Sequence, residues 1–100
     1  VQGSFTLDGI KGLIKEGGSS RKAHIAKVVD GLGGSLEAFY FAFGQDDVVA
    51  IFDLPDNIAI TALSLAVGAG GAFQPKTTVL IDPEDMDEAV KKTVSYRPAL

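Results

Sequence analysis

The stretch that decides the fold begins Leu-Glu-Ala-Phe-Tyr-Phe-Ala-Phe (36–43) and continues Gly-Gln-Asp-Asp (44–47), Val-Val-Ala-Ile-Phe-Asp (48–53) and Leu-Pro-Asp (54–56). Two runs rich in aromatic and β-branched residues flank a Gly/Asp turn, which predicts a β-hairpin. Alternation along the first run assigns one face to Leu36, Ala38, Tyr40 and Ala42, and the other to Phe39, Phe41 and Phe43. Both faces are apolar, whereas the helices of a small domain cover one face of a sheet. The second face is therefore expected to meet another subunit or to enclose an apolar cavity.

The residues before this hairpin predict one strand and two short helices. Residues 1–5 read as a strand, and Thr6 or Asp8 is expected to cap a helix that ends near residue 16. Gly-Gly at 17–18 interrupts the helical pattern. Ser19 or Ser20 is then expected to cap a second helix that runs to about residue 32, where further glycines end it.

The residues after the hairpin predict helix, strand and helix. Residues 57–67 read as a helix, 73–81 as the last strand, 83–92 as a helix capped by Asp82, and 92–100 as an extended tail. The order of elements is that of a ferredoxin-like α/β sandwich (βαββαβ) with an extra C-terminal helix. We therefore expect an α+β fold with a four-stranded antiparallel sheet, helices on one face, and a single domain over residues 1–100.

The composition favours a self-associating protein in a reducing compartment. Hydrophobic residues make up 46% of the 100 residues, which is high for a monomer of this size, so a homo-oligomer (a dimer or higher) is expected. The net charge of −4 disfavours nucleic-acid partners, because phosphates would be repelled. The lack of cysteine fits the cytoplasm. No membrane partner is expected, and a start at Val1 inside a strand indicates that a few upstream residues are missing.

The hairpin and its flanks resemble the GYD-domain proteins, which are small prokaryotic proteins of unassigned function. The resemblance covers nearly the whole chain and rests on residues 31–34 (Gly-Leu-Gly-Gly), the strand and turn 36–49, and the helix start 54–56. It implies a ferredoxin-like fold grouped with dimeric α/β barrels, with no established activity, cofactor or catalytic residue. Asp46 stands where the family usually has Tyr, so any chemical role of that Tyr is missing here.

The candidates for a ligand pocket include the only histidine and one cation on the buried side of a helix. Arg21 precedes Ile25 of an apolar helical stripe by four residues, so it needs an acidic partner, such as Asp47 or Asp53, or an anionic ligand. His24 is a candidate base, but one histidine without cysteine makes no typical zinc site, so no metal is expected. A small apolar or anionic ligand and no cofactor are expected. The candidate pocket residues are Arg21, His24, Tyr40, Phe41 and Asp47.

The uncharged helix 57–67 has apolar residues on two sides. One row consists of Ile58, Ala62 and Leu65, and the other of Ile60, Leu63 and Val67. One sheet cannot cover so wide an apolar arc, so the helix is expected to contact another subunit. The candidate interface residues are Phe39, Phe41, Phe43, Ile60, Leu63 and Val67.

Three functions are compatible with the sequence, and no catalytic residue is assigned. The first, which we favour, is a homo-oligomeric binding or assembly protein without catalysis. The second is a cofactor-independent enzyme of the dimeric-barrel type, such as a small monooxygenase or isomerase. The third is a metabolite-sensing module, which ligand-dependent melting shifts would reveal. A cavity that reaches His24 or Arg21 would favour the enzyme, and a sheet face filled by Phe and Val would favour the first function.

Overall fold

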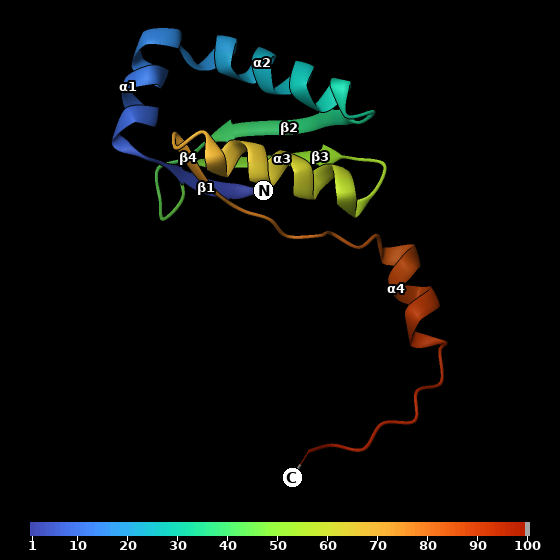
Figure 1. The fold of residues 1–100 in the computed structure, drawn as a ribbon. Coiled ribbons are helices and arrows are strands. Elements are labelled where there is room, and N and C mark those ends of the chain that lie inside the picture. The colour runs from blue at the N-terminus through green and yellow to red at the C-terminus, as the bar shows by residue number, and fades with distance from the viewer. Residues whose placement is uncertain (100) are drawn as a thin grey trace.

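The computed structural model describes residues 1–99 and has a four-stranded antiparallel sheet with the strand order β2-β3-β1-β4 (Figure 1). The elements are β1 (Gln2–Phe5), α1 (Leu7–Glu16), α2 (Gly18–Gly31), β2 (Ser35–Phe41), β3 (Val48–Asp53), α3 (Asn57–Ala69), β4 (Phe73–Lys76) and α4 (Pro83–Val90). This arrangement confirms the predicted α+β, ferredoxin-like sandwich. Leu100, the last residue of the predicted tail, lies outside the described residues.

Side-chain caps begin two of the helices where the sequence predicted them. The Thr6 hydroxyl accepts a hydrogen bond from the Gly9 N–H at 3.2 Å, and the Asp56 carboxylate accepts one from the Ala59 N–H at 2.8 Å. The expectation that Ser19 or Ser20 caps α2 is wrong. That helix already begins at Gly18, because Gly17 turns the chain with a φ of +89° and itself occupies the cap position.

A one-residue bulge in β2 decides which side chains face the helices. The pairing with β3 steps from Leu36 opposite Phe52 to Ala38 opposite Ile51, so Glu37 is the extra residue. An extra residue in one strand reverses the alternation of faces along that strand. Before the bulge the even-numbered side chains of β2 therefore face the helices, and after it the odd-numbered ones do.

The bulge corrects the predicted division of β2 into two faces. Leu36 shares its face with Phe39 and Phe41, because their partners on β3 are alternate residues, and it does not share the face of Ala38. The predicted strand also ends earlier, since residues 42–43 lie outside it. A regular period of two cannot reveal a bulge, which is why the sequence pattern misassigned Leu36.

The face of the sheet away from α2 and α3 is apolar on β2 and β3 and polar on β1 and β4. Tyr40, Val49, Gln2 and Lys76 follow one another across the four strands. Tyr40 is 68% exposed and Ile51 is 38% exposed on this side. We call the apolar half of this surface the open face, which consists of Ala38, Tyr40, Val49 and Ile51.

The last strand is shorter than predicted, and the chain beyond it leaves the body. β4 pairs with β1 from Phe73 opposite Phe5 to Lys76 opposite Gln2, and residues 77–81 lack a ladder partner among residues 1–99. The predicted extension to residue 81 is therefore wrong. Residues 77–99, here called the C-terminal arm, are exposed throughout and carry α4 away from the sheet (Figure 1). The radius of gyration is accordingly 16.8 Å, against about 13 Å for a compact chain of this length.

Helix α1 is held against the start of β4 by backbone contacts. The Thr6 N–H donates to the Ala72 carbonyl oxygen at 3.0 Å, and the Thr6 hydroxyl donates to the Gly71 carbonyl oxygen at 2.8 Å. Gly9 is buried beside Ala72, where a Cβ atom would overlap the Ala72 carbonyl oxygen. A residue without a side chain is therefore required at position 9.

We expect Gly9→Ala to lower the free energy of unfolding by roughly 1–3 kcal/mol, because the added methyl group overpacks this contact. The matched control is Gly12→Ala in the same helix, where a Cβ meets no atom within 4 Å. This control should raise stability by about 0.5–1 kcal/mol through helix propensity. Urea unfolding of both variants measures the difference, and equal stabilities would contradict the close contact of α1 with β4.

Candidate functional site

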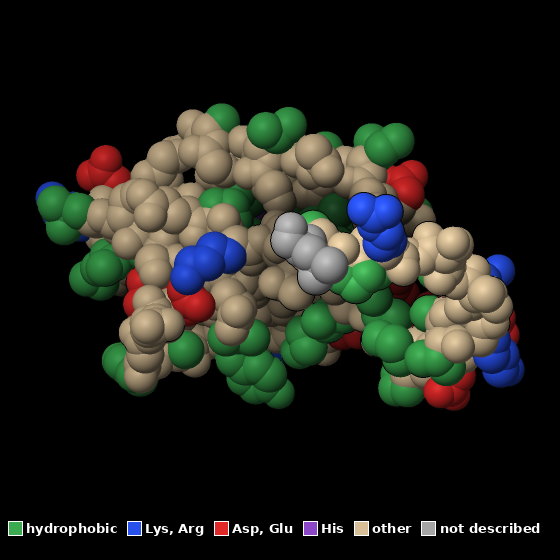
Figure 2. Space-filling model, turned by 90° about the horizontal axis from the view of Figure 1, so that it is seen from below, with side chains coloured by type: hydrophobic (Ala, Val, Ile, Leu, Met, Phe, Trp, Pro, Cys, Tyr) green, Lys and Arg blue, Asp and Glu red, His purple; other side chains and the backbone are tan. Residues whose placement is uncertain are grey.

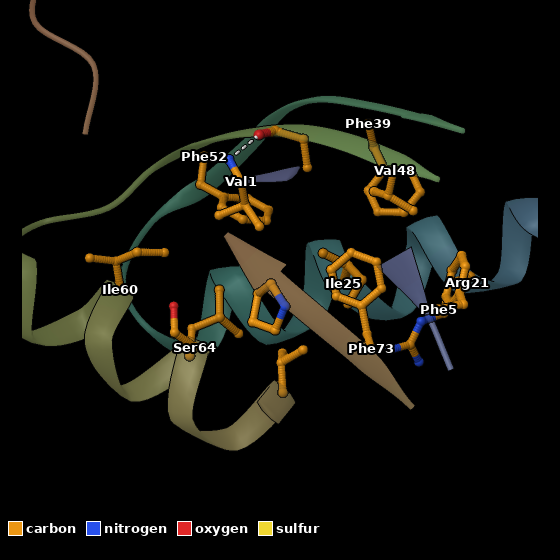
Figure 3. A pocket seen from close by; sticks show the side chains of 14 residues that line it. Val1, Phe5, Arg21, Ile25, Phe39, Val48, Phe52, Ile60, Ser64 and Phe73 are labelled. Carbon is orange, nitrogen blue, oxygen red and sulfur yellow. Dashed lines mark hydrogen bonds between the residues drawn. The ribbon is translucent and has the colours of Figure 1, made fainter. Parts of the chain in front are cut away.

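The candidate site is an apolar cavity of about 60 Å³ between the sheet and the helices α2 and α3 (Figure 3). Both helices contribute to it, so they cover the same face of the sheet. Its lining side chains include Arg21 and Ile25 from α2, Ile60, Leu63, Ser64 and Val67 from α3, and Phe5, Phe39, Val48, Ala50, Phe52 and Phe73 from the strands. The cavity is open on one side and is shaped mainly by aromatic rings and branched aliphatic side chains.

Arg21 is the one ionisable side chain that lines this cavity. It is half-buried, and Figure 3 shows it at the end of the cavity near Phe5 and Phe73. A guanidinium group stays charged at all physiological pH values, so Arg21 can bind an anionic group but cannot act as a general base. The arrangement is therefore suited to hold a small apolar ligand that carries an anionic group.

The expected ion pair of Arg21 with Asp47 or Asp53 is not formed. The ion pair found within residues 1–99 joins Lys76 to Asp46 at 2.8 Å. The Asp47 carboxylate accepts a hydrogen bond from the Phe5 N–H at 3.0 Å instead. Asp53 is exposed at the end of β3 that pairs with Ser35, and this end is distant along β2 from the start of α2.

Two further polar groups lie at the cavity. The Ser64 hydroxyl hydrogen-bonds the Thr77 hydroxyl at 2.9 Å, so this side of the cavity touches the first residue of the arm. The Val1 ammonium donates to the Ala50 carbonyl oxygen at 2.8 Å (Figure 3). Burial lowers the pKa of this ammonium from its ordinary value of 8.0. No sequence pattern indicates Ser64 as a cavity residue, because its position depends on how α3 is rotated over the sheet.

The predicted pocket residues are divided between different parts of the molecule. Arg21 alone lines the cavity. His24 is exposed on α2, and Tyr40 lies on the open face. Phe41 is 41% exposed beside the cavity, with its ring centroid 6.5 Å from that of Phe5. Asp47 belongs to the turn before β3.

Four of the six predicted interface residues face the interior of this chain. Phe39, Ile60, Leu63 and Val67 line the cavity, and Leu63 is only 7% exposed. Phe43 lies beyond β2 and is fully exposed. On α3 the outward apolar row is therefore the other one, in which Ile58 is 79% and Leu65 is 69% exposed.

The turn between β2 and β3 is anchored to the neighbouring strands. Asp46 pairs with Lys76 of β4, and its side chain is 14% exposed. The Asp47 N–H donates to the Gly3 carbonyl oxygen at 2.8 Å, in addition to the bond that its carboxylate accepts from β1. The two aspartates thus fasten the β2–β3 turn to the sheet.

A second hollow of about 350 Å³ lies where the arm leaves the sheet. Its walls are the end of β3, the loop 53–56 and the arm residues 77–80. The sequence could not indicate it, since it depends on the path of the arm. No group of three potential metal ligands occurs among residues 1–99, and none of the helices described there is long and apolar enough to cross a membrane.

Comparison with known proteins adds the family and nothing on activity. No curated protein and no solved structure matches the chain significantly. The GYD domain matches residues 1–90, which include every strand and helix found within residues 1–99. The matched residues contain the hairpin, the anchored turn and the helices over one face of the sheet. The chain therefore belongs to the GYD domain family.

Proposed function

We propose that this protein is a homo-oligomeric binding or assembly protein that acts without catalysis in the cytoplasm. The observation that carries the proposal is the excess of exposed over buried apolar side chains. The buried hydrophobic residues are Val29, Val48, Ala50, Ala59 and Leu63. Sixteen large hydrophobic residues are exposed within residues 1–99, on the open face, at the end of β2 and just beyond it, on α1, on the outside of α3 and along the arm.

Exposed apolar area on this scale favours association. Each square ångström of apolar surface removed from water stabilises a complex by roughly 25 cal/mol before the costs of association. Figure 2 shows hydrophobic side chains at the surface in several places, with charged groups between them. The open face is the broadest candidate, because Tyr40, Val49 and Ile51 lie on two adjacent strands and have no covering helix.

We expect Ile51→Lys to shift the protein towards smaller assemblies, because it introduces a charge into the open face. The matched control is Ala23→Lys, which adds the same charge to the exposed surface of α2 and should leave the subunit number unchanged. Native mass spectrometry over a range of concentrations measures both variants. A wild-type protein that stays monomeric at all concentrations would overturn the proposal. If Ile51→Lys forms the same oligomer as the wild type, the open face is not the interface.

A second candidate function is the binding of a small ligand in the cavity, either as an enzyme of the dimeric-barrel type or as a metabolite sensor. The observation that favours it is that Arg21 reaches the cavity and makes no ion pair within residues 1–99. An apolar wall with a cationic side chain selects a small hydrophobic carboxylate over a neutral molecule of the same shape.

We expect wild-type protein to bind propionate, a carboxylate small enough for this cavity, and Arg21→Met to weaken that binding by roughly tenfold or more, since a hydrogen bond to a charged group is lost. The melting temperature of the free protein should change little, because no ion pair is removed. Lys22→Met removes the same charge from an exposed position and should bind normally. Calorimetric titration measures all three proteins, and equal affinities would contradict a role for Arg21.

A further inference from the structure

Helix α1 presents an apolar stripe to solvent. Leu7, Ile10 and Ile14 recur at the spacing of one helix face and are 69%, 43% and 79% exposed. Lys11 and Lys15 follow along one side of this stripe. The opposite side of α1 is the one that carries Gly9 against β4, so the stripe cannot pack on the body of its own chain.

Helix α4 presents a stripe with the opposite charge beside it. Met86 and Val90 lie on one face and are 51% and 74% exposed. Asp87 lies along one side of this face, and Glu84 lies further round the helix on the same side. The remainder of α4 is exposed as well, so the helix has no packing partner among residues 1–99.

We propose that α4 of one copy packs antiparallel on α1 of a second copy. The stripe of α1 has three exposed apolar residues and that of α4 has two. Lys11 and Asp87 lie on the same side of their stripes when each helix is viewed from its N-terminus. An antiparallel arrangement therefore brings Asp87 and Glu84 to the side that carries Lys11 and Lys15, whereas a parallel arrangement separates the charges. The proposal rests on the proposed self-association and identifies the second copy as the partner of the arm.

The direction of the chain favours a second copy over the same chain. β4 begins beside α1, where the Thr6 N–H contacts the Ala72 carbonyl oxygen, and then runs away from it. The arm continues in that direction, so α1 and α4 lie at opposite ends of the molecule (Figure 1). Two copies related by a twofold axis can each donate an arm to the other, and this reciprocal exchange closes the assembly as a dimer.

Charge-swapped variants test this contact. Lys11→Glu/Lys15→Glu makes the α1 side acidic, and Glu84→Lys/Asp87→Lys makes the α4 side basic. Each double variant alone sets like charges against one another, and we expect its dimer dissociation constant to rise by roughly tenfold or more. A mixture of the two variants restores opposite charges at both contacts, so heterodimers should form with nearly the wild-type affinity. Native mass spectrometry with one variant labelled with ¹⁵N distinguishes heterodimers from homodimers.

The outcomes separate this contact from the wider proposal of self-association. A mixture without preference for heterodimers, while the wild type is oligomeric, overturns the α1–α4 contact and leaves association through the open face. A wild-type protein that is monomeric throughout overturns both. A third variant carries all four substitutions in one chain. If this variant recovers the wild-type dimer affinity while the mixture forms no heterodimers, α4 packs on α1 of its own chain, and the proposed exchange is overturned.

Disulfide formation gives a second readout that does not depend on affinity. The chain has no cysteine, so introduced cysteines report only their own contact. We expect Ile10→Cys and Val90→Cys proteins, when mixed under mild oxidation, to form a mixed disulfide-linked dimer. Glu88→Cys, on the face of α4 opposite Met86 and Val90, is the matched control for Val90→Cys and should crosslink to Ile10→Cys much less. Equal crosslinking of positions 88 and 90 would overturn the assigned face of α4.

Discussion

The register between β2 and β3 is the constraint on which the rest of the structure depends. Because Glu37 is the extra residue, Leu36 faces the same side as Phe39 and Phe41, under α2 and α3. The other side of the same strand is left with Tyr40 and Ala38. The extra residue thus decides which side chains of β2 form the aromatic interior and which form the apolar exterior. A shift of one residue moves every side chain of a strand to the opposite face.

The ends of the sheet hold this register in place. The Asp47 carboxylate and N–H bond β1 on both sides of Ser4, and the Asp46 carboxylate pairs with Lys76 on β4. At the other edge of β1, the close approach of Gly9 to Ala72 ties α1 to the beginning of β4. The hairpin, both halves of the sheet and the first helix are therefore connected through a few backbone and aspartate side-chain contacts. This explains how a domain with so few buried side chains maintains one arrangement.

The cavity and the outer surface suit different functions. The β2–β3 register determines which side chains each of them receives. Arg21 is the only cationic side chain among the cavity residues, so the interior is suited to binding an anionic ligand. The exterior has apolar groups on the open face, on α1 and on α4, which are suited to contacts between copies. Self-association and ligand binding are compatible, because the surfaces that they use lie on opposite sides of the sheet or at its ends.

The sequence by itself determined the elements, their order and most of their boundaries. Thr6, one of the two predicted candidates, caps α1, and α3 begins after Asp56 as predicted. The hairpin at 44–47 also forms, because these are local interactions between residues close in the chain. Four other decisions needed the tertiary structure. They are the bulge at Glu37, the rotation of α3 that turns Leu63 inward and Leu65 outward, the distribution of the predicted site residues, and the departure of the arm after Lys76. Each depends on which distant strand or helix lies opposite, and the spacing of residues in one segment carries no information about its partner.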